Sequence, residues 1–461
     1  MSRFPLPIAS NELRSRPAST ARLLNAYAEQ LPQGAKSAVL LTRAAGVADW
    51  TTVGNGVIQG AHAALGSLFV VSGTKLYEVD ENGSATELGD IGTVGNLDID
   101  SNGDTVVVVN EPNAFYWDGT TFGQITDADF TSRGAGDVEF VDNWLLFREP
   151  NSGRFFGADL GSATSFDALN FATAEGFPDD LVGLKVDHRD VILFGSESVE
   201  IWGNVGIAGF PFERVTNGYL EIGCFNGRTV AKQDNSVFWL ANDYTVRRLD
   251  GNTPIRVSSH AVEQSIVNAT IGSARAFSYS QDGHLFYVLT FPEVTWVYDA
   301  TTQQWHERQS YGRDNWDVIC HAKAYGREIV GDQRSNKVGY LDPSTYDEWG
   351  NTLVMLWRYQ PIYAEANLAF HDRLELVLET GVGLTTGQGS DPEVLLRYSN
   401  DGGQTWTALP NRSIGPIGRY DARVVWSRLG SARQRVYEMS VSDPVRVNVT
   451  DTQVEVRGGR L

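Results

Sequence analysis

An acidic run in the first quarter of the chain has the spacing closest to that of a metal site. Residues 98–104 read DIDSNGD and begin like the calcium-binding loop of an EF-hand. Such a loop needs a bidentate Glu at its twelfth position, where this chain has Val109. The flanking residues have the pattern of strands, whereas an EF-hand loop lies between helices. We therefore expect a plain turn between two strands here.

Histidine, cysteine and carboxylate residues elsewhere are candidates for zinc binding or acid–base catalysis. Cys320 and His321 are neighbours, but their spacing from His306 and His260 matches no zinc pattern. Acidic pairs such as 179–180 are expected by chance among 57 Asp and Glu residues. The chain has no phosphate-binding Gly loop, no G-x-S-x-G and no H-E-x-x-H. We predict no catalytic residue, no metal and no cofactor, so the protein is not expected to be an enzyme.

The sharpest local motif is SNDGGQTW at residues 399–406. It fits the Asp-box pattern S-x-D-x-G-x-T-W and resembles turns of sialidase-like propellers. Its members are Ser399, Asp401, Gly403, Thr405 and Trp406. We expect Asp401 to accept hydrogen bonds from turn amides, Gly403 to take a positive φ, and Trp406 to pin the next strand into the core. Because a sialidase needs several boxes, three arginines and a Tyr nucleophile, one box predicts a structural turn.

Two groups of residues are candidates for docking another subunit or protein. The first group lies near the N-terminus and contains Tyr27, Glu29, Lys36 and Arg43. The second contains Arg419, Arg423 and Arg428, with further arginines at positions 433 and 435. On a strand, residues 419 and 423 would share one face and form a basic edge. A solvated strand face is the simpler interpretation of this cluster, and a surface for an acidic partner is the alternative.

A repeating β unit accounts for most of the chain. Short runs with aromatic residues return about every 40–48 residues, each followed by an Asp, Asn or Gly turn and a second run. Residues 68–79 and 296–308 are two instances. Seven such units lie between residues 56 and 350. We predict an all-β fold with a β-propeller at 56–350. Six blades are possible. We favour seven, because an N-terminal strand can complete the last blade.

The two ends of the chain have different patterns. Residues 1–55 are locally basic, and we expect an extended arm that packs on the propeller or a neighbour, with a short helix at 22–30. Deletion of residues 1–50 is then expected to leave a folded monomer. Residues 351–461 alternate cleanly between apolar and polar positions, as at Leu374–Glu379. They predict a small C-terminal β domain, either a barrel or a sandwich.

Composition restricts the partners and the compartment. The net charge of −20 and the pI of about 4.8 argue against sequence-specific nucleic-acid binding. Two cysteines, Cys224 and Cys320, exclude a disulfide scaffold. The N-terminus has no apolar core of signal-peptide length, and apolar runs such as Val106–Val109 are far too short for membrane insertion. We expect a soluble protein made in a reducing cytoplasm.

Several segments resemble the packaged-DNA stabilisation proteins, or tail hubs, of short-tailed, P22-like phages. The most specific ones lie in the arm and near the C-terminus. They are residues 25–29, 32–37 and 41–46, the first-blade residues 68–77, and residues 424–430 and 441–445. One departure is Ala45, where a proline is expected before the glycine.

The resemblance implies a non-enzymatic part of the virion, made in the host cytoplasm. Such hubs form a six-copy ring below the portal and its tail adaptor, and they stabilise the packaged DNA. They hold the tail needle or plug and give tailspikes or fibres a place to attach. Two alternatives stay open at this point: a propeller enzyme that hydrolyses host glycans, and a propeller that only binds them.

Overall fold

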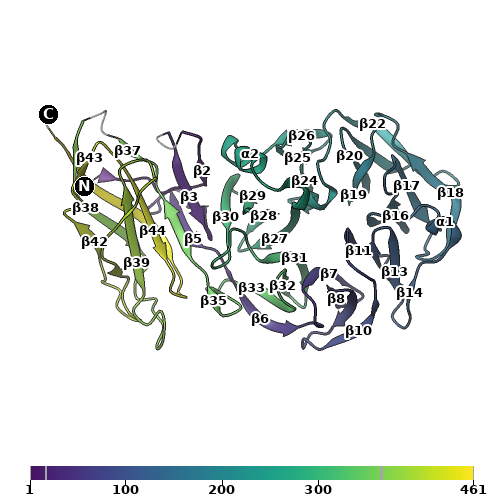
Figure 1. Cartoon of the computed structure of the whole chain (residues 1–461), viewed down its shortest axis with the longest axis horizontal. Helices are drawn as coiled ribbons and strands as arrows, with labels where there is room; N and C mark the ends of the chain where they lie inside the picture. The colour runs from purple at the N-terminus through teal and green to yellow at the C-terminus, as the bar shows by residue number, and fades with distance from the viewer. Residues whose placement is uncertain (1, 16–17, 364–366, 460–461) are drawn as a thin grey trace.

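The computed structural model describes residues 2–15, 18–363 and 367–459 and shows an elongated molecule with a propeller at one end and a sandwich at the other (Figure 1). Both termini lie at the sandwich end. Within the described residues, seven four-stranded antiparallel units form the propeller. The predictions of an all-β fold and of seven blades are therefore confirmed.

The first five blades are consecutive in the sequence. Blade one is β7 (Ile58–Ala64), β8 (Ser67–Ser72), β9 (Lys75–Val79) and β10 (Ala85–Asp90), and blade two is β11 (Leu97–Ser101), β12 (Val106–Asn110), β13 (Asn113–Trp117) and β14 (Phe122–Gln124). Blade three is β15 (Val138–Val141), β16 (Trp144–Arg148), β17 (Arg154–Ala158) and β18 (Phe166–Thr173), and blade four is β19 (Leu181–Asp187), β20 (Asp190–Gly195), β21 (Val199–Asn204) and β22 (Phe212–Leu220). Blade five is β23 (Ala231–Gln233), β24 (Ser236–Leu240), β25 (Val246–Asp250) and β26 (Thr253–Arg256).

The last two blades connect the ring to the rest of the chain. Blade six is β27 (Arg275–Gln281), β28 (His284–Phe291), β29 (Val294–Asp299) and β30 (Gln304–Arg308). Blade seven is β31 (Val318–Ala324), β32 (Arg327–Asp332) and β33 (Lys337–Asp342), with β6 (Gly46–Thr52) as its outer strand. An N-terminal strand thus closes the ring, as the sequence predicted. The helical turns are α1 (Ala128–Thr131), η1 (Gly227–Thr229), α2 (His260–Val267) and η2 (Ile271–Ser273).

The second strand of each blade is buried on both faces, because blades stack against one another around the ring. On β12, Val106 and Val108 pack toward blade one, whereas Val107 and Val109 pack toward blade three. This is why these strands are continuous apolar runs instead of alternating ones.

The C-terminal region is a sandwich of two sheets, which resolves the barrel-or-sandwich alternative. One sheet contains β4 (Ala26–Gln30), β5 (Val39–Arg43), β45 (Asn448–Gly458), β38 (Ala369–Leu378) and β42 (Val424–Ser427), with β1 (Ser2–Arg3) and β43 (Ser431–Ala432) at its edges. The other contains β3 (Thr20–Leu24), β36 (Met355–Arg358), β44 (Gln434–Val441), β39 (Glu393–Ser399) and β40 (Thr407–Ala408), with β2 (Asn11–Glu12), β37 (Ile362–Tyr363) and β41 (Arg412–Ser413). The core between them includes Trp357, Tyr437 and Trp426. In β39, buried Val394 and Leu396 alternate with exposed Leu395, as a one-sided strand requires.

The expected helix at residues 22–30 is wrong. The structure has strands β3 and β4 there, separated by Asn25 at φ 51°. Strand β3 pairs with β36 and contacts β30, so one sheet runs from blade six into the sandwich. These partners lie far away in the sequence and override the local helix preference.

The described residues among the first 50 are therefore part of both bodies. They supply β3, β4 and β5 and most of β6, the strand that closes blade seven. Strand β34 (Asp347–Glu348) pairs with the other edge of β6, and β35 (Asn351–Thr352) pairs with β34. The expectation that this segment is removable without loss of folding is contradicted by these pairings. The proposed boundaries at residues 55 and 350 stay predictions.

Candidate functional site

A channel runs through the propeller and is lined by the innermost strands of its blades. It contains a cavity of about 290 Å³. All of its lining residues belong to the innermost strands β7, β11, β15, β19, β23, β27 and β31 or to the segments directly before them. Of the turn predicted at residues 98–104, residues 98–101 belong to strand β11, and only residues 102–104 lie in the connection to β12. Asp98 lines the cavity.

Carboxylates of one blade accept backbone N–H groups of the next blade around the channel. Asp98 accepts from Val138 N at 3.1 Å, and Asp100 accepts from Phe140 N at 2.6 Å. Glu139 repeats the contact one blade further on, accepting from Val186 N at 3.1 Å. These bonds satisfy backbone amides of the inner strands β15 and β19, and they join blade two to blade three and blade three to blade four. We call Asp98, Asp100 and Glu139 the acidic belt.

Lys185 lies within the acidic belt and forms an ion pair with Glu139. Burial opposes its charge, but Glu139 and Asp98 outweigh burial and hold the pKa of Lys185 above the usual value. Burial raises the pKa of Asp98 to about 7; Lys185 opposes this rise and Glu139 adds to it. Burial and Lys185 lower the pKa of His62 to about 4. The belt thus holds more acids than one cation can neutralise.

Sequence reasoning missed the acidic belt, although one signal was present. Asp98 and Asp100 lie two residues apart on a strand and therefore share a face. Because the same residues resemble a calcium loop, a turn was expected here and not a cluster of acids. In the structure that turn is braced by Asn102, which accepts from Thr105 N at 2.8 Å.

The N-terminal docking candidates are mostly engaged within the chain. Tyr27 is buried against His284 and Phe286 of blade six, with ring centroids 4.8 and 5.4 Å apart. Glu29 lies 3.7 Å from His284 Nε2. Burial leaves the Tyr27 side chain inaccessible to a partner, which corrects its proposed docking role.

Arg43 is also buried and cannot dock a partner. It donates to the carbonyl oxygens of Val445, at 2.8 Å, and of Leu353, and so ties the arm to the sandwich. Lys36 is the exception, because it is exposed in the turn between β4 and β5.

Asn25 joins the arm, blade six and the sandwich at one point. Its side-chain amide donates to the carbonyl oxygens of Gln309 and Val354, both at 2.9 Å. Its side-chain oxygen accepts from Gln309 N at 3.1 Å. Asn tolerates the left-handed backbone found here better than other non-glycine residues do.

The C-terminal arginines do not form one basic strand edge. Arg419 and Arg423 lie in the loop before β42, not on a strand, which corrects the expected shared face. Arg423 pairs with Glu375 at 2.7 Å, and Arg428 is exposed at φ 60°. Arg435 is buried, with its guanidinium 4.2 Å from the Tyr398 ring centre. What remains is an exposed loop surface with Arg419, Arg423 and Arg428.

The Asp-box forms a braced turn between β39 and β40. Asp401 accepts from Gln404 N and Thr405 N, both at 2.9 Å, and Gly403 has φ 91°. Ser399 Oγ donates to Asp401 at 2.6 Å, and these bonds hold the Asp401 pKa well below its usual range. Trp406 is not in the core as expected. It is half-buried under guanidinium groups of the sandwich, because β40 is a short edge strand.

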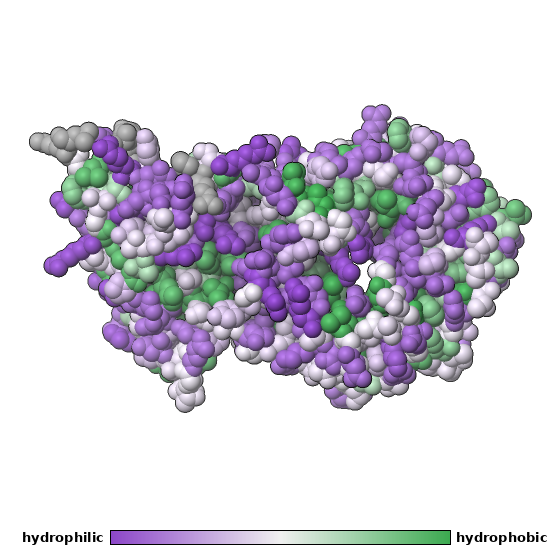
Figure 2. All heavy atoms as spheres, viewed as in Figure 1, coloured by the Kyte–Doolittle hydropathy of each residue, from purple (hydrophilic) through white to green (hydrophobic). Residues whose placement is uncertain are grey.

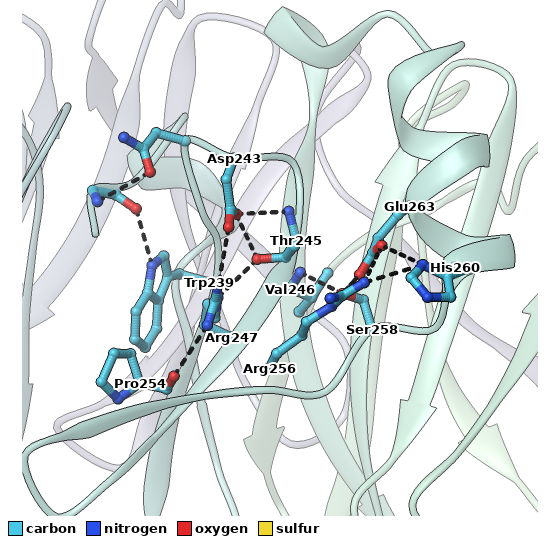
Figure 3. A network of polar contacts seen from close by, with 12 residues as sticks. Trp239, Asp243, Thr245, Val246, Arg247, Pro254, Arg256, Ser258, His260 and Glu263 are labelled. Carbon is cyan, nitrogen blue, oxygen red and sulfur yellow. Dashed lines mark hydrogen bonds and ion pairs between the residues drawn. The ribbon is translucent and has the colours of Figure 1, made fainter. Parts of the chain in front are cut away.

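The cysteine and histidine residues considered for zinc lie apart. His260 begins α2 and contacts Arg256 and Glu263 on the outside of blade five (Figure 3). His306 is buried, and burial lowers its pKa to about 3. Over the described residues, no group of three or more His, Cys, Asp or Glu residues is placed to hold a metal. Nor does the described chain contain a helix long and apolar enough to cross a membrane.

Two family models together match nearly all of the chain. One, described as "Bacteriophage P22 Gp10, beta-propeller", matches residues 18–346. The other, described as "Bacteriophage P22 Gp10, beta-sandwich", matches residues 357–457. A search of the curated proteins found no match.

Solved structures give weaker likenesses. The computationally designed Ika8 protein is 14% identical with a TM-score of 0.40, over 64% of this chain and 99% of that one. PorZ of Porphyromonas gingivalis, described as a surface component of the type-IX secretion system, is 13% identical with a TM-score of 0.42. That match covers 78% of this chain and 46% of PorZ, so the chain spans less than half of PorZ. Neither likeness bears on function.

Proposed function

Because the chain belongs to the Bacteriophage P22 Gp10 family of phage structural proteins, we propose that it is a tail hub of the virion. In this role six copies form a ring below the portal and its tail adaptor. The ring closes the channel of the portal and tail adaptor after DNA packaging, and it stabilises the packaged genome. No step of this role requires catalysis.

One structural observation carries the proposal: the two bodies are joined by a continuous sheet. Strand β3 lies between β30 of blade six and β36 of the sandwich. Beside it, Arg308 is buried with its guanidinium 4.1 Å from the Trp316 ring centre and 3.8 Å from Glu348. A part that closes the head after DNA packaging has to keep its shape, and strand pairing across the junction supports such rigidity.

The charge distribution also suits a protein past which DNA moves. Residues 56–356 contain 42 Asp and Glu but only 19 Lys and Arg residues. Polar residues dominate the face of the propeller that Figure 2 shows. Carboxylates repel phosphates, so an acidic lumen of the six-copy ring would not hold the leaving genome.

Exposed residues of the arm and sandwich are our candidates for attachment of the tail adaptor, the needle or plug, and the tailspikes or fibres. They are Lys36 in the β4–β5 turn and Arg419, Arg423 and Arg428 in the loops around β42. Their side chains reach solvent, and an acidic partner surface would complement them.

Quantitative mass spectrometry of purified phage particles tests the proposed function. We expect about six copies of this chain for each virion, counted against the portal protein in the same run. Absence from the particle would overturn the structural role. Purified protein would then be tested for binding and hydrolysis of host glycans.

A further inference from the structure

Two arginines of the propeller stand out because the protein itself does not neutralise them. Between residues 56 and 356, every other Lys and Arg lies within 4 Å of a carboxylate or over an aromatic ring. Arg228 and Arg275 have neither kind of neighbour, although this whole stretch of the chain is described. In a region with twice as many acids as bases, this is unexpected.

The two arginines come from adjacent blades and line the same cavity. Arg228 lies in η1, directly before β23, and Arg275 is the first residue of β27. Both line the channel cavity of about 290 Å³. Arg228 Nη2 donates to Gly272 O at 2.9 Å, three residues before Arg275, which links the two segments.

The acids that line the same cavity are already engaged by other groups. Asp137 forms an ion pair with Arg148, and Asp98 accepts from Val138 N beside Lys185. These acids come from blades two and three, whereas the arginines come from blades five and six. The charge of the pair is uncompensated, because neither arginine forms an ion pair within the described chain. Burial and the charge of Arg228 accordingly lower the pKa of Arg275.

We propose that Arg228 and Arg275 form a binding site for a phosphate-type oxyanion at the end of the channel where the inner strands begin. Two guanidinium groups supply several N–H donors in planar forks, the arrangement that suits tetrahedral oxyanions. A bound dianion would also remove the repulsion between the two cations. The ligand is either free inorganic phosphate or the terminal phosphate of a mononucleotide.

Titration calorimetry and thermal melting of the full chain test this site. Sodium phosphate is compared with sodium chloride at equal ionic strength, so that general screening is held constant. We expect saturable binding of one phosphate per chain and a melting temperature that rises with phosphate concentration. Arg228→Gln and Arg275→Gln should each weaken binding by about tenfold or more, since each removes charge-assisted hydrogen bonds. Arg189→Gln, at an exposed arginine paired with Asp142, is the matched control and should bind like the parent.

A second measurement separates binding from folding defects. Without phosphate, Arg275→Gln should melt at or above the parent temperature, because it relieves repulsion. Repeating the titration with a nucleoside monophosphate identifies the source of the ligand: tighter binding than inorganic phosphate indicates a nucleotide, and equal binding indicates the free ion. Absence of saturable phosphate binding, or full binding by both Gln variants, would overturn the proposal.

Discussion

At the residue scale, the acidic belt combines a structural role with an electrostatic cost. Asp98, Asp100 and Glu139 each accept a backbone N–H from the next blade, so each has a specific partner in the ring. Burial raises the pKa of all three carboxyl groups, and Lys185 opposes this rise. The direct consequence is a stability that depends on pH through Asp98.

Replacing Asp98 by Asn should change the pH profile of stability. The folded pKa of about 7 lies above the unfolded value of about 3.9, so the folded state loses stability as pH rises between these values. Asn cannot ionise, but its oxygen can still accept from Val138 N. We expect the stability of Asp98→Asn to gain on that of the parent as the pH rises from about 4 to 7, by a few kcal/mol in all at about 1.4 kcal/mol per pKa unit, and the difference to stay constant above pH 7.

Asp118→Asn is the control for this experiment and should behave oppositely. Hydrogen bonds from Thr121 N and the Thr120 side chain lower the Asp118 pKa, so its contribution is present above about pH 4 and is lost as pH falls. Thermal melts at several pH values measure both differences. A pH-independent difference for Asp98→Asn would contradict the raised pKa.

At the element scale, the N-terminal strands hold the two bodies together. Strand β6 closes blade seven through β33, and β3 joins blade six to the sandwich. Without these strands, both bodies would expose unpaired strand edges. They would also lose the fully buried side chains of Leu23 and Val47, which leaves core neighbours such as Trp357 and Leu341 uncovered.

Deletion of residues 1–52 should therefore abolish cooperative folding of the remaining chain. We expect a protein that aggregates or is rapidly cleaved by protease, instead of a folded monomer that merely fails to assemble. The control replaces the exposed turn at residues 33–36 with Gly and Ser and should melt within about 1 kcal/mol of the parent. A deletion variant with a sharp thermal transition and protease resistance would show that the strands are dispensable.

At the scale of the whole molecule, the continuous sheet predicts a fixed distance between the propeller and the sandwich. Spin labels at Leu169→Cys and Tyr420→Cys, both exposed positions at opposite ends, can report that distance. Burial raises the pKa of the native Cys224 and Cys320 thiols to about 12, which disfavours their labelling. Pulsed dipolar spectroscopy should give one narrow distance distribution.

The same labelled protein tests the junction through Asn25. Asn25→Ala leaves two carbonyl oxygens and one amide without their partner, so it should cost about 3 kcal/mol and broaden the distribution. Asn217→Ala is a matched control, because Asn217 also has a positive φ but is exposed. A broad distribution in the parent would contradict a rigid junction.

Part of the candidate site was predictable from short patterns, and part was not. The Asp-box turn depends on side chains within seven residues of one another, and its hydrogen bonds follow from residue type and spacing. The surroundings of Tyr27, Arg43 and Arg435 do not follow from residue type and spacing. Each is engaged by partners such as His284, Leu353 and Tyr398, which lie elsewhere in the chain.

The sequence by itself determined the all-β class, the repeating blades and the alternation of the C-terminal strands. These features depend on the two-residue period of strands and on turn residues, which are local. Only the tertiary structure decided that the strands between residues 20 and 52 are shared between two bodies, that Asp98 and Asp100 join neighbouring blades, and that Arg228 and Arg275 line one cavity. Strand partners and facing charges come from residues brought together by ring closure, and no local pattern encodes that closure.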